Sequence, residues 1–138
     1  MYVEGIRNWK VTTVRSVAVK QSLMMFLGFI TSIAYINDGE FTFGLVLVVF
    51  SSVFLLGIFE RKTMSFSYKI AHLYVGSILM MIATGYLILT FAFSHFNLLV
   101  GEPSLRLSIP DFLLILTGIM SLFNVISLKK AVTREKTP

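Results

Sequence analysis

The residues best suited to chemistry in this sequence are its two histidines, His72 and His95, and its few carboxylates. A neutral imidazole can ligate haem or a metal ion, or relay protons. Neither histidine has an aspartate or glutamate three or four positions later, so the spacings typical of zinc and di-iron sites are absent. The sequence also has no cysteine, which excludes thiolate metal sites, iron–sulfur clusters and disulfides within the chain. We therefore predict no metal site.

His72 is the one side chain that we single out as a candidate for cofactor binding. It lies about one turn into an apolar run, where it could help a partner subunit hold haem or quinone. His95 lies near the other end of the same predicted helix, roughly 35 Å away at about 1.5 Å per residue. The two histidines therefore cannot share one haem. The simpler interpretation is a headgroup-region histidine bonded to a neighbour or a lipid, and we predict no cofactor for this chain by itself.

Catalytic motifs are absent from the sequence. It has no glycine-rich phosphate loop, no His-Glu-x-x-His and no Gly-x-Ser-x-Gly. No apolar run carries a carboxylate near its middle, whereas charged groups inside a membrane usually mark ion or proton pathways. We expect that the chain is not an enzyme, and at most a subunit of one.

Composition indicates a membrane protein. Of the 138 residues, 56% are hydrophobic and only 14% are charged. Soluble domains have about 45–50% apolar and about 25% charged residues. A soluble core of this size could not hide the excess apolar surface, which must face lipid or partner proteins.

Four apolar runs are long enough to cross a bilayer, which requires roughly 20 mostly apolar residues. The Asn-Asp-Gly-Glu sequence at 37–40 is typical of a tight turn, so it makes the first two runs a helical hairpin. We predict an all-α integral membrane protein with a single membrane domain, either an up-down-up-down bundle or two packed helical hairpins. The predicted segments are a cytoplasmic amino-terminal segment at 1–16, spans at 17–36, 41–59, 70–95 and 110–128, and a cytoplasmic tail at 129–138. A short surface helix is one interpretation of the first segment.

The basic residues predict the orientation. Of the 12 lysines and arginines, only Arg106 falls outside the two tails, the edge of the first run and the link between the second and third runs. The positive-inside rule therefore places both termini in the cytoplasm. The net charge of +5 is then a topology signal, and we expect no nucleic acid partner. We expect a multi-pass protein of a prokaryotic cytoplasmic membrane.

Small and polar residues inside the runs are interpreted as packing residues. Small side chains let membrane helices approach closely, and buried amides can bridge them. The predicted packing residues are Gly28, Ser32, Gly76, Gly85, Gly118 and Asn124. Ser108 and Asp111 have the spacing of a helix cap, in which the aspartate also faces the positive end of the helix dipole.

These features favour a non-catalytic accessory subunit of a larger membrane complex, such as a respiratory or membrane-oxidase assembly. Its partners would be other integral membrane subunits and lipids. One alternative is a small homo-oligomeric transporter or channel for a neutral or cationic solute. A further alternative is an electron-transfer subunit that binds haem or quinone through His72.

Overall fold

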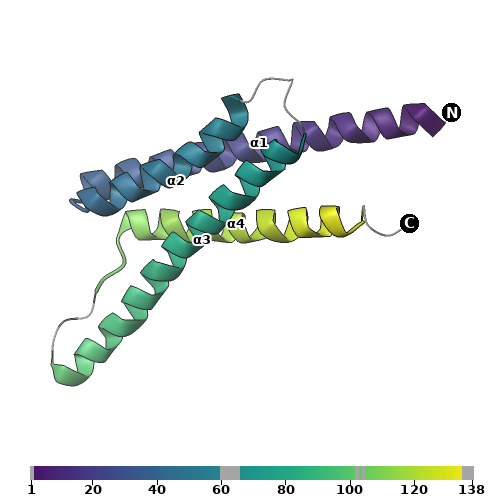
Figure 1. The fold of residues 1–138 in the computed structure, drawn as a ribbon. Helices are drawn as coiled ribbons and strands as arrows, with labels where there is room; N and C mark the ends of the chain where they lie inside the picture. Colours follow the sequence, from purple (N-terminus) through teal and green to yellow (C-terminus); the bar gives the residue numbers. More distant parts are fainter. Residues whose placement is uncertain (1, 60–65, 102, 104, 135–138) are drawn as a thin grey trace.

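The computed structural model describes residues 2–59, 66–101, 103 and 105–134, and all of its regular elements are helices. They are α1 (Tyr2–Asn37), α2 (Phe41–Phe59), α3 (Phe66–Asn97), a single 3-10 turn η1 (Leu98–Val100) and α4 (Ile109–Arg134) (Figure 1). Each of the four α-helices is long and apolar enough to cross a membrane. The prediction of an all-α protein with four membrane-length helices is therefore confirmed.

The apolar stretches of the four helices can be compared directly with the predicted spans. They cover Ser16–Asn37, Phe41–Phe59, Tyr68–Asn97 and Ile109–Lys129, so each end lies within two residues of the prediction. The amino-terminal segment differs. Residues 2–16 are helical and continuous with the first apolar stretch, because α1 runs without interruption from Tyr2 to Asn37. No proline interrupts this stretch, so nothing stops the helix before the turn at Asp38.

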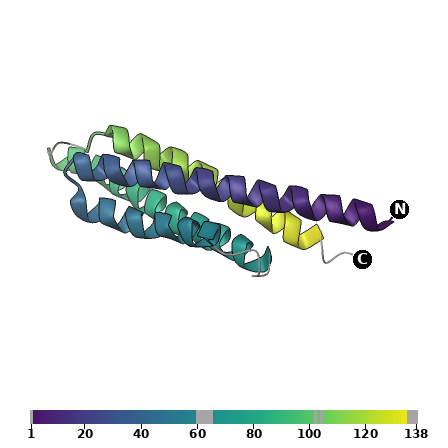
Figure 2. The same cartoon turned by 90° about the horizontal axis from the view of Figure 1, so that it is seen from above.

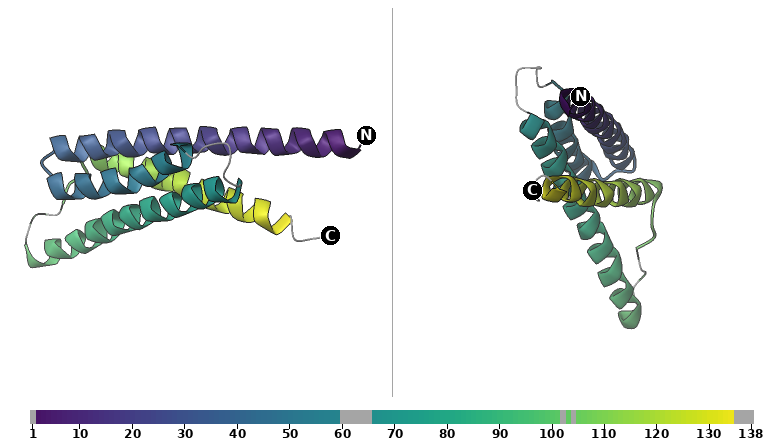
Figure 3. Two further views of the ribbon diagram at one scale, coloured as in Figure 1. Left: turned by 45° about the horizontal axis from the view of Figure 1, so that its top comes forward. Right: turned by 90° about the vertical axis from the view of Figure 1, so that its right-hand side faces the viewer.

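The four helices contact one another in chain order, and α4 returns to contact α1. Consecutive helices run in opposite directions (Figure 3). The start of α1 and the end of α4 therefore lie at the same end of the molecule (Figure 2). The helix α3 leans away from the other three, so that its carboxyl end stands clear of them (Figure 1).

The turn between α1 and α2 is a helix C-cap of the Schellman type. The Glu40 amide donates to the Tyr35 carbonyl at 2.9 Å, and the Gly39 amide donates to the Ile36 carbonyl at 3.3 Å. Gly39 has φ of 95°, in the left-handed region that glycine adopts without steric cost. Because the cap ends α1 sharply, α2 begins immediately at Phe41 and packs back along it.

The interior of the bundle is built from small and polar side chains as much as from apolar ones. Most of the buried hydroxyls bond to a carbonyl of their own helix; Ser32, for example, donates to Gly28 O and Ser51 to Leu47 O, both at 2.7 Å. Large apolar side chains such as Phe26 and Phe123 point outward instead and are more than 60% exposed. A polar interior with an apolar exterior is suited to a lipid environment. The buried polar residues are Gln21, Thr31, Ser32, Ser51, Ser77, Thr84, Ser94, Thr117, Ser121 and Asn124.

Glycines allow the closest helix contacts. A Cβ added at Gly118 of α4 would lie 2.7–2.8 Å from carbon atoms of Thr84 on α3, and one at Gly76 of α3 would lie 2.7 Å from the Phe54 ring on α2. Such distances are too short for two carbon atoms. Gly85 differs, because a Cβ there would meet no atom within 4 Å.

We predict that Gly118→Ala lowers the free energy of unfolding by about 1–3 kcal/mol, because the added methyl group overpacks the contact with Thr84. The matched control is Gly85→Ala on α3, which we expect to be neutral or to stabilise by up to about 1 kcal/mol through helix propensity. Thermal unfolding of the detergent-solubilised variants measures both effects. Equal melting temperatures for the two variants would contradict the close α3–α4 contact.

Candidate functional site

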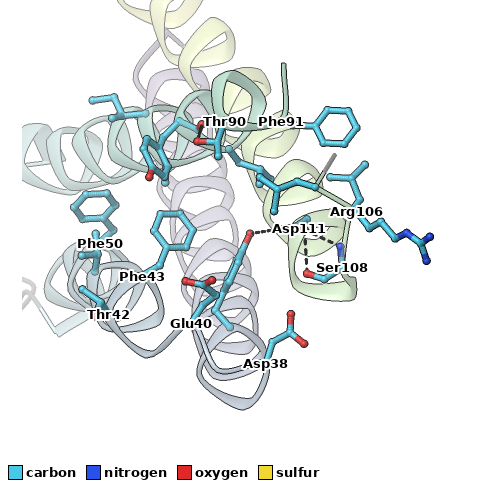
Figure 4. A pocket seen from close by; sticks show the side chains of 18 residues that line it. Asp38, Glu40, Thr42, Phe43, Phe50, Thr90, Phe91, Arg106, Ser108 and Asp111 are labelled. Carbon is cyan, nitrogen blue, oxygen red and sulfur yellow. Dashed lines mark hydrogen bonds between the residues drawn. The ribbon is translucent and has the colours of Figure 1, made fainter. Parts of the chain in front are cut away.

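A pocket of about 750 Å³ lies at the end of the bundle that holds the α1–α2 turn (Figure 4). Its walls come from the end of α1, the first half of α2, the second half of α3 and the segment at 105–108 that leads into α4. The volume falls within the range of about 300–1,000 Å³ that is typical of small-molecule sites. The pocket exists because α3 leans away from α2 toward this end, while α1 and α2 stay together (Figure 1).

One wall of the pocket is a hydrogen-bonded group that joins α1 to the start of α4. The Tyr35 hydroxyl donates to Asp111 Oδ1 at 2.6 Å. The second oxygen of the same carboxylate, Oδ2, accepts from the Ser108 amide at 2.7 Å and from the Ser108 hydroxyl at 3.0 Å. Ser108 and Asp111 thus form the half of a capping box in which the carboxylate accepts from the amide of the residue before the helix, and Asp111 lies in the first turn of α4. Both oxygens of Asp111 have hydrogen-bond partners, so the main role of this carboxylate is to hold α1 against the start of α4.

Aromatic rings from three helices form a second wall, which shares Tyr35 with the first. The Phe43 ring of α2 makes an edge contact with Tyr35 of α1, with ring centroids 4.9 Å apart. It also meets Tyr86 of α3 in a tilted arrangement with centroids 5.8 Å apart. Phe50 of α2 and Phe91 of α3 add two more rings to the lining. The negative faces of such rings attract cations within about 6 Å.

Charge in the pocket is mostly negative. Three carboxylates line it, those of Asp38, Glu40 and Asp111, against one guanidinium, that of Arg106. Asp38 and Glu40 are exposed, and among the described residues no ion pair or side-chain hydrogen bond engages either carboxylate. The Arg106 side chain extends away from the other labelled side chains (Figure 4). The free acidic groups at the rim are therefore those of the α1–α2 turn.

The structure does not bring His72 to this pocket. His72 lies on α3 at the opposite end of the bundle, where it is half-buried and its Nδ1 lies 2.9 Å from the Tyr68 carbonyl. His95 lies near the other end of α3, with its Nδ1 2.9 Å from the Phe91 carbonyl. Across the described ranges, no three His, Cys, Asp or Glu side chains are grouped in a way that could hold a metal ion. Haem or quinone binding at His72 stays a prediction.

The predicted packing residues occupy different environments. Gly28 approaches Ser51 of α2 and Met80 of α3, and Ser32 is fully buried. Gly76 and Gly118 make the close contacts described above, whereas Gly85 makes none. Asn124 is 5% exposed on α4, but its Nδ2 has no hydrogen-bond partner within the part of the chain that is described. The expected amide bridge between helices is therefore not made by that nitrogen.

The sequence reasoning did not predict this pocket. The sequence analysis assigned Asp38, Gly39 and Glu40 to a turn and Asp111 to a helix cap. Each residue was explained locally, and no local pattern specifies that α3 leans away and opens a space between them. One available signal was that Asp38, Glu40 and Asp111 lie in or next to the two links on one side of the predicted membrane, where Arg106 is the one basic residue in the sequence.

No family model, curated protein or solved structure was found to match this chain. Functional argument therefore depends on the residues and their geometry.

We predict that Tyr35→Phe destabilises the protein by about 1.5–3 kcal/mol, the range for a hydrogen bond to a charged group. The matched control is Tyr86→Phe, which removes a hydroxyl from the same pocket where no hydrogen bond is formed with another described residue. Thermal unfolding in detergent measures the difference. A double-mutant cycle with Asp111→Ala isolates the coupling between the two groups, and a coupling energy near zero would show that the bond contributes nothing.

Proposed function

We propose that this chain is a non-catalytic accessory subunit of a larger membrane complex, and that the outer end of α3 is where a partner membrane subunit packs. The observation that carries the proposal is an apolar helix end whose large side chains are mostly exposed. The carboxyl end of α3 projects away from α1, α2 and α4 in two perpendicular views (Figure 1, Figure 3). Large apolar side chains cover this end.

The length of α3 explains why its end stands clear. Its apolar stretch, Tyr68–Asn97, has 30 residues, which is roughly 45 Å at about 1.5 Å per residue. The hydrocarbon core of a bilayer is only about 30 Å thick, so the helix must tilt or project beyond it. At its end and in η1, Phe93, Leu99 and Val100 are 66%, 83% and 80% exposed. An apolar surface of this kind at the membrane boundary is suited to burial against another membrane protein.

The interior of the bundle supports a non-catalytic role. Among the described buried residues, none carries a formal charge, and Met24, Leu47 and Leu114 are completely buried between the helices. Most hydroxyls in this interior donate to backbone carbonyls, so their protons are already used in hydrogen bonds within the protein. An uncharged, closely packed interior favours a role in which the chain acts by binding other subunits, without catalysis of its own.

The proposed orientation follows from charge. With an up-down-up-down arrangement, the end that holds the start of α1 and the end of α4 is cytoplasmic, because both of these helix ends are basic. The pocket end, with Asp38, Glu40 and Asp111, then faces outward. In keeping with this, we propose a prokaryotic cytoplasmic membrane as the location.

A second candidate is a homo-oligomeric transporter for a cationic solute, and the acidic rim of the pocket is the observation that favours it. The completely buried side chains beneath the pocket would have to separate for a solute to pass. An electron-transfer subunit that binds haem or quinone at His72 is a third candidate.

We predict that photo-crosslinking side chains placed at Phe93 and Leu99 form adducts with a second membrane protein in native membranes. The same group at Phe26 and Phe123, which are equally exposed on α1 and α4, should form adducts with lipid only. Mass spectrometry of the adducts identifies the products. Lipid adducts at all four positions, together with purification of the chain alone, would refute the subunit proposal.

A further inference from the structure

We propose that the pocket beneath the α1–α2 turn binds a cationic amphiphile, a molecule with one hydrocarbon chain and a quaternary or protonated ammonium head. The inference goes beyond the proposed function, because it concerns a ligand of this chain and not its partner subunit. It also uses a different surface from the outer end of α3. Three properties of the pocket carry it, namely its acidic rim, its aromatic wall and its apolar interior.

The rim selects for positive charge. Asp38 and Glu40 are separated by one residue in the turn, and both line the opening of the pocket (Figure 4). The turn itself is held by hydrogen bonds between backbone groups, so neither carboxylate is needed to stabilise it. The single guanidinium of the pocket, on Arg106, extends away from these carboxylates (Figure 4). A cation at the rim would therefore find two acceptors that no described group already neutralises.

The aromatic wall adds a preference for an alkylated ammonium. Tyr35, Phe43 and Tyr86 form a continuous series of ring contacts from α1 through α2 to α3. Aromatic side chains grouped around a cation are a recognised way to bind quaternary ammonium, which offers no hydrogen-bond donor. Because the carboxylates lie at the turn and the rings begin directly beneath it, one ammonium head can meet both kinds of group.

The interior of the pocket fits a hydrocarbon chain. Further from the turn than Phe43 and Tyr86, the lining consists of Val46 and Phe50 of α2 and Ile82 and Ala83 of α3. These residues belong to the apolar stretches of both helices. A ligand that has only a cationic head would leave this part of the pocket unfilled, and a plain hydrocarbon would leave the acidic rim unused.

The test measures binding of radiolabelled dodecyltrimethylammonium to the full-length protein in maltoside detergent, by equilibrium dialysis against protein-free micelles. We expect saturable binding to the wild type. The double variant Asp38→Asn/Glu40→Gln should bind about tenfold more weakly, which corresponds to about 1.4 kcal/mol. Tyr86→Leu, which keeps apolar bulk at an exposed position, should bind about threefold more weakly, as expected for loss of one ring face.

The control is the charge-conserving variant Asp38→Glu/Glu40→Asp, which should bind like the wild type. Dodecylphosphocholine tests whether a zwitterionic lipid headgroup is the source of the ammonium, and we expect it to compete at least tenfold less well because the carboxylates repel its phosphate. Equal competition by dodecylphosphocholine would overturn recognition of a net cation. Unchanged binding in Asp38→Asn/Glu40→Gln, or no saturable binding to the wild type, would overturn the proposal altogether.

Discussion

The close approach of helices through small side chains is the constraint on which the rest of this structure depends. Lipid is as apolar as the helix surfaces, so burial of apolar area does little to drive membrane helices together. Association then relies on close packing and on hydrogen bonds between helices. Thr84 provides both at one point, since it packs against Gly118 and donates to Met80 O at 2.9 Å and to Leu114 O at 3.1 Å. This contact fixes α3 to α4 near the middle of each helix.

The pocket is a consequence of where these contacts lie. On its first half α3 is held by Gly76 against Phe54, and by the Lys69 carbonyl, which accepts from Gln21 Nε2 at 2.9 Å. Beyond Thr84, the side-chain hydrogen bonds of α3 among the described residues go to carbonyls of α3 itself, as those of Thr90 and Ser94 do. The apolar stretch of α3 is also longer than a bilayer is thick. The helix therefore diverges from α2 toward the acidic end. The Tyr35–Asp111 bond keeps α1 and α4 together at that end, so the opening forms only on the α3 side.

The sequence was sufficient to predict the helices but not their angles. Apolar runs and the turn at 37–40 predicted the four membrane-length helices, because each of these features is a property of consecutive residues. The continuation of α1 to Tyr2 was missed, since basic residues were interpreted as a boundary although they do not interrupt a helix. The tilt of α3 could not be predicted, because it depends on which faces of helices that are apolar all round meet one another. His72 and Asn124 show the same difficulty, as residue type alone did not identify their neighbours.

The residues that give the pocket its chemistry also have structural positions, which explains why sequence reasoning assigned them no function. A carboxylate in the middle of a span would be costly, so acidic groups can be accommodated only where helices begin and end. Asp38 and Glu40 flank the glycine that ends α1, and Asp111 lies in the first turn of α4. The fold brings these two chain segments to one side of the bundle. Any recognition of charged ligands by this protein is therefore confined to its helix ends. The packing of the helices in the interior determines how far apart those ends lie.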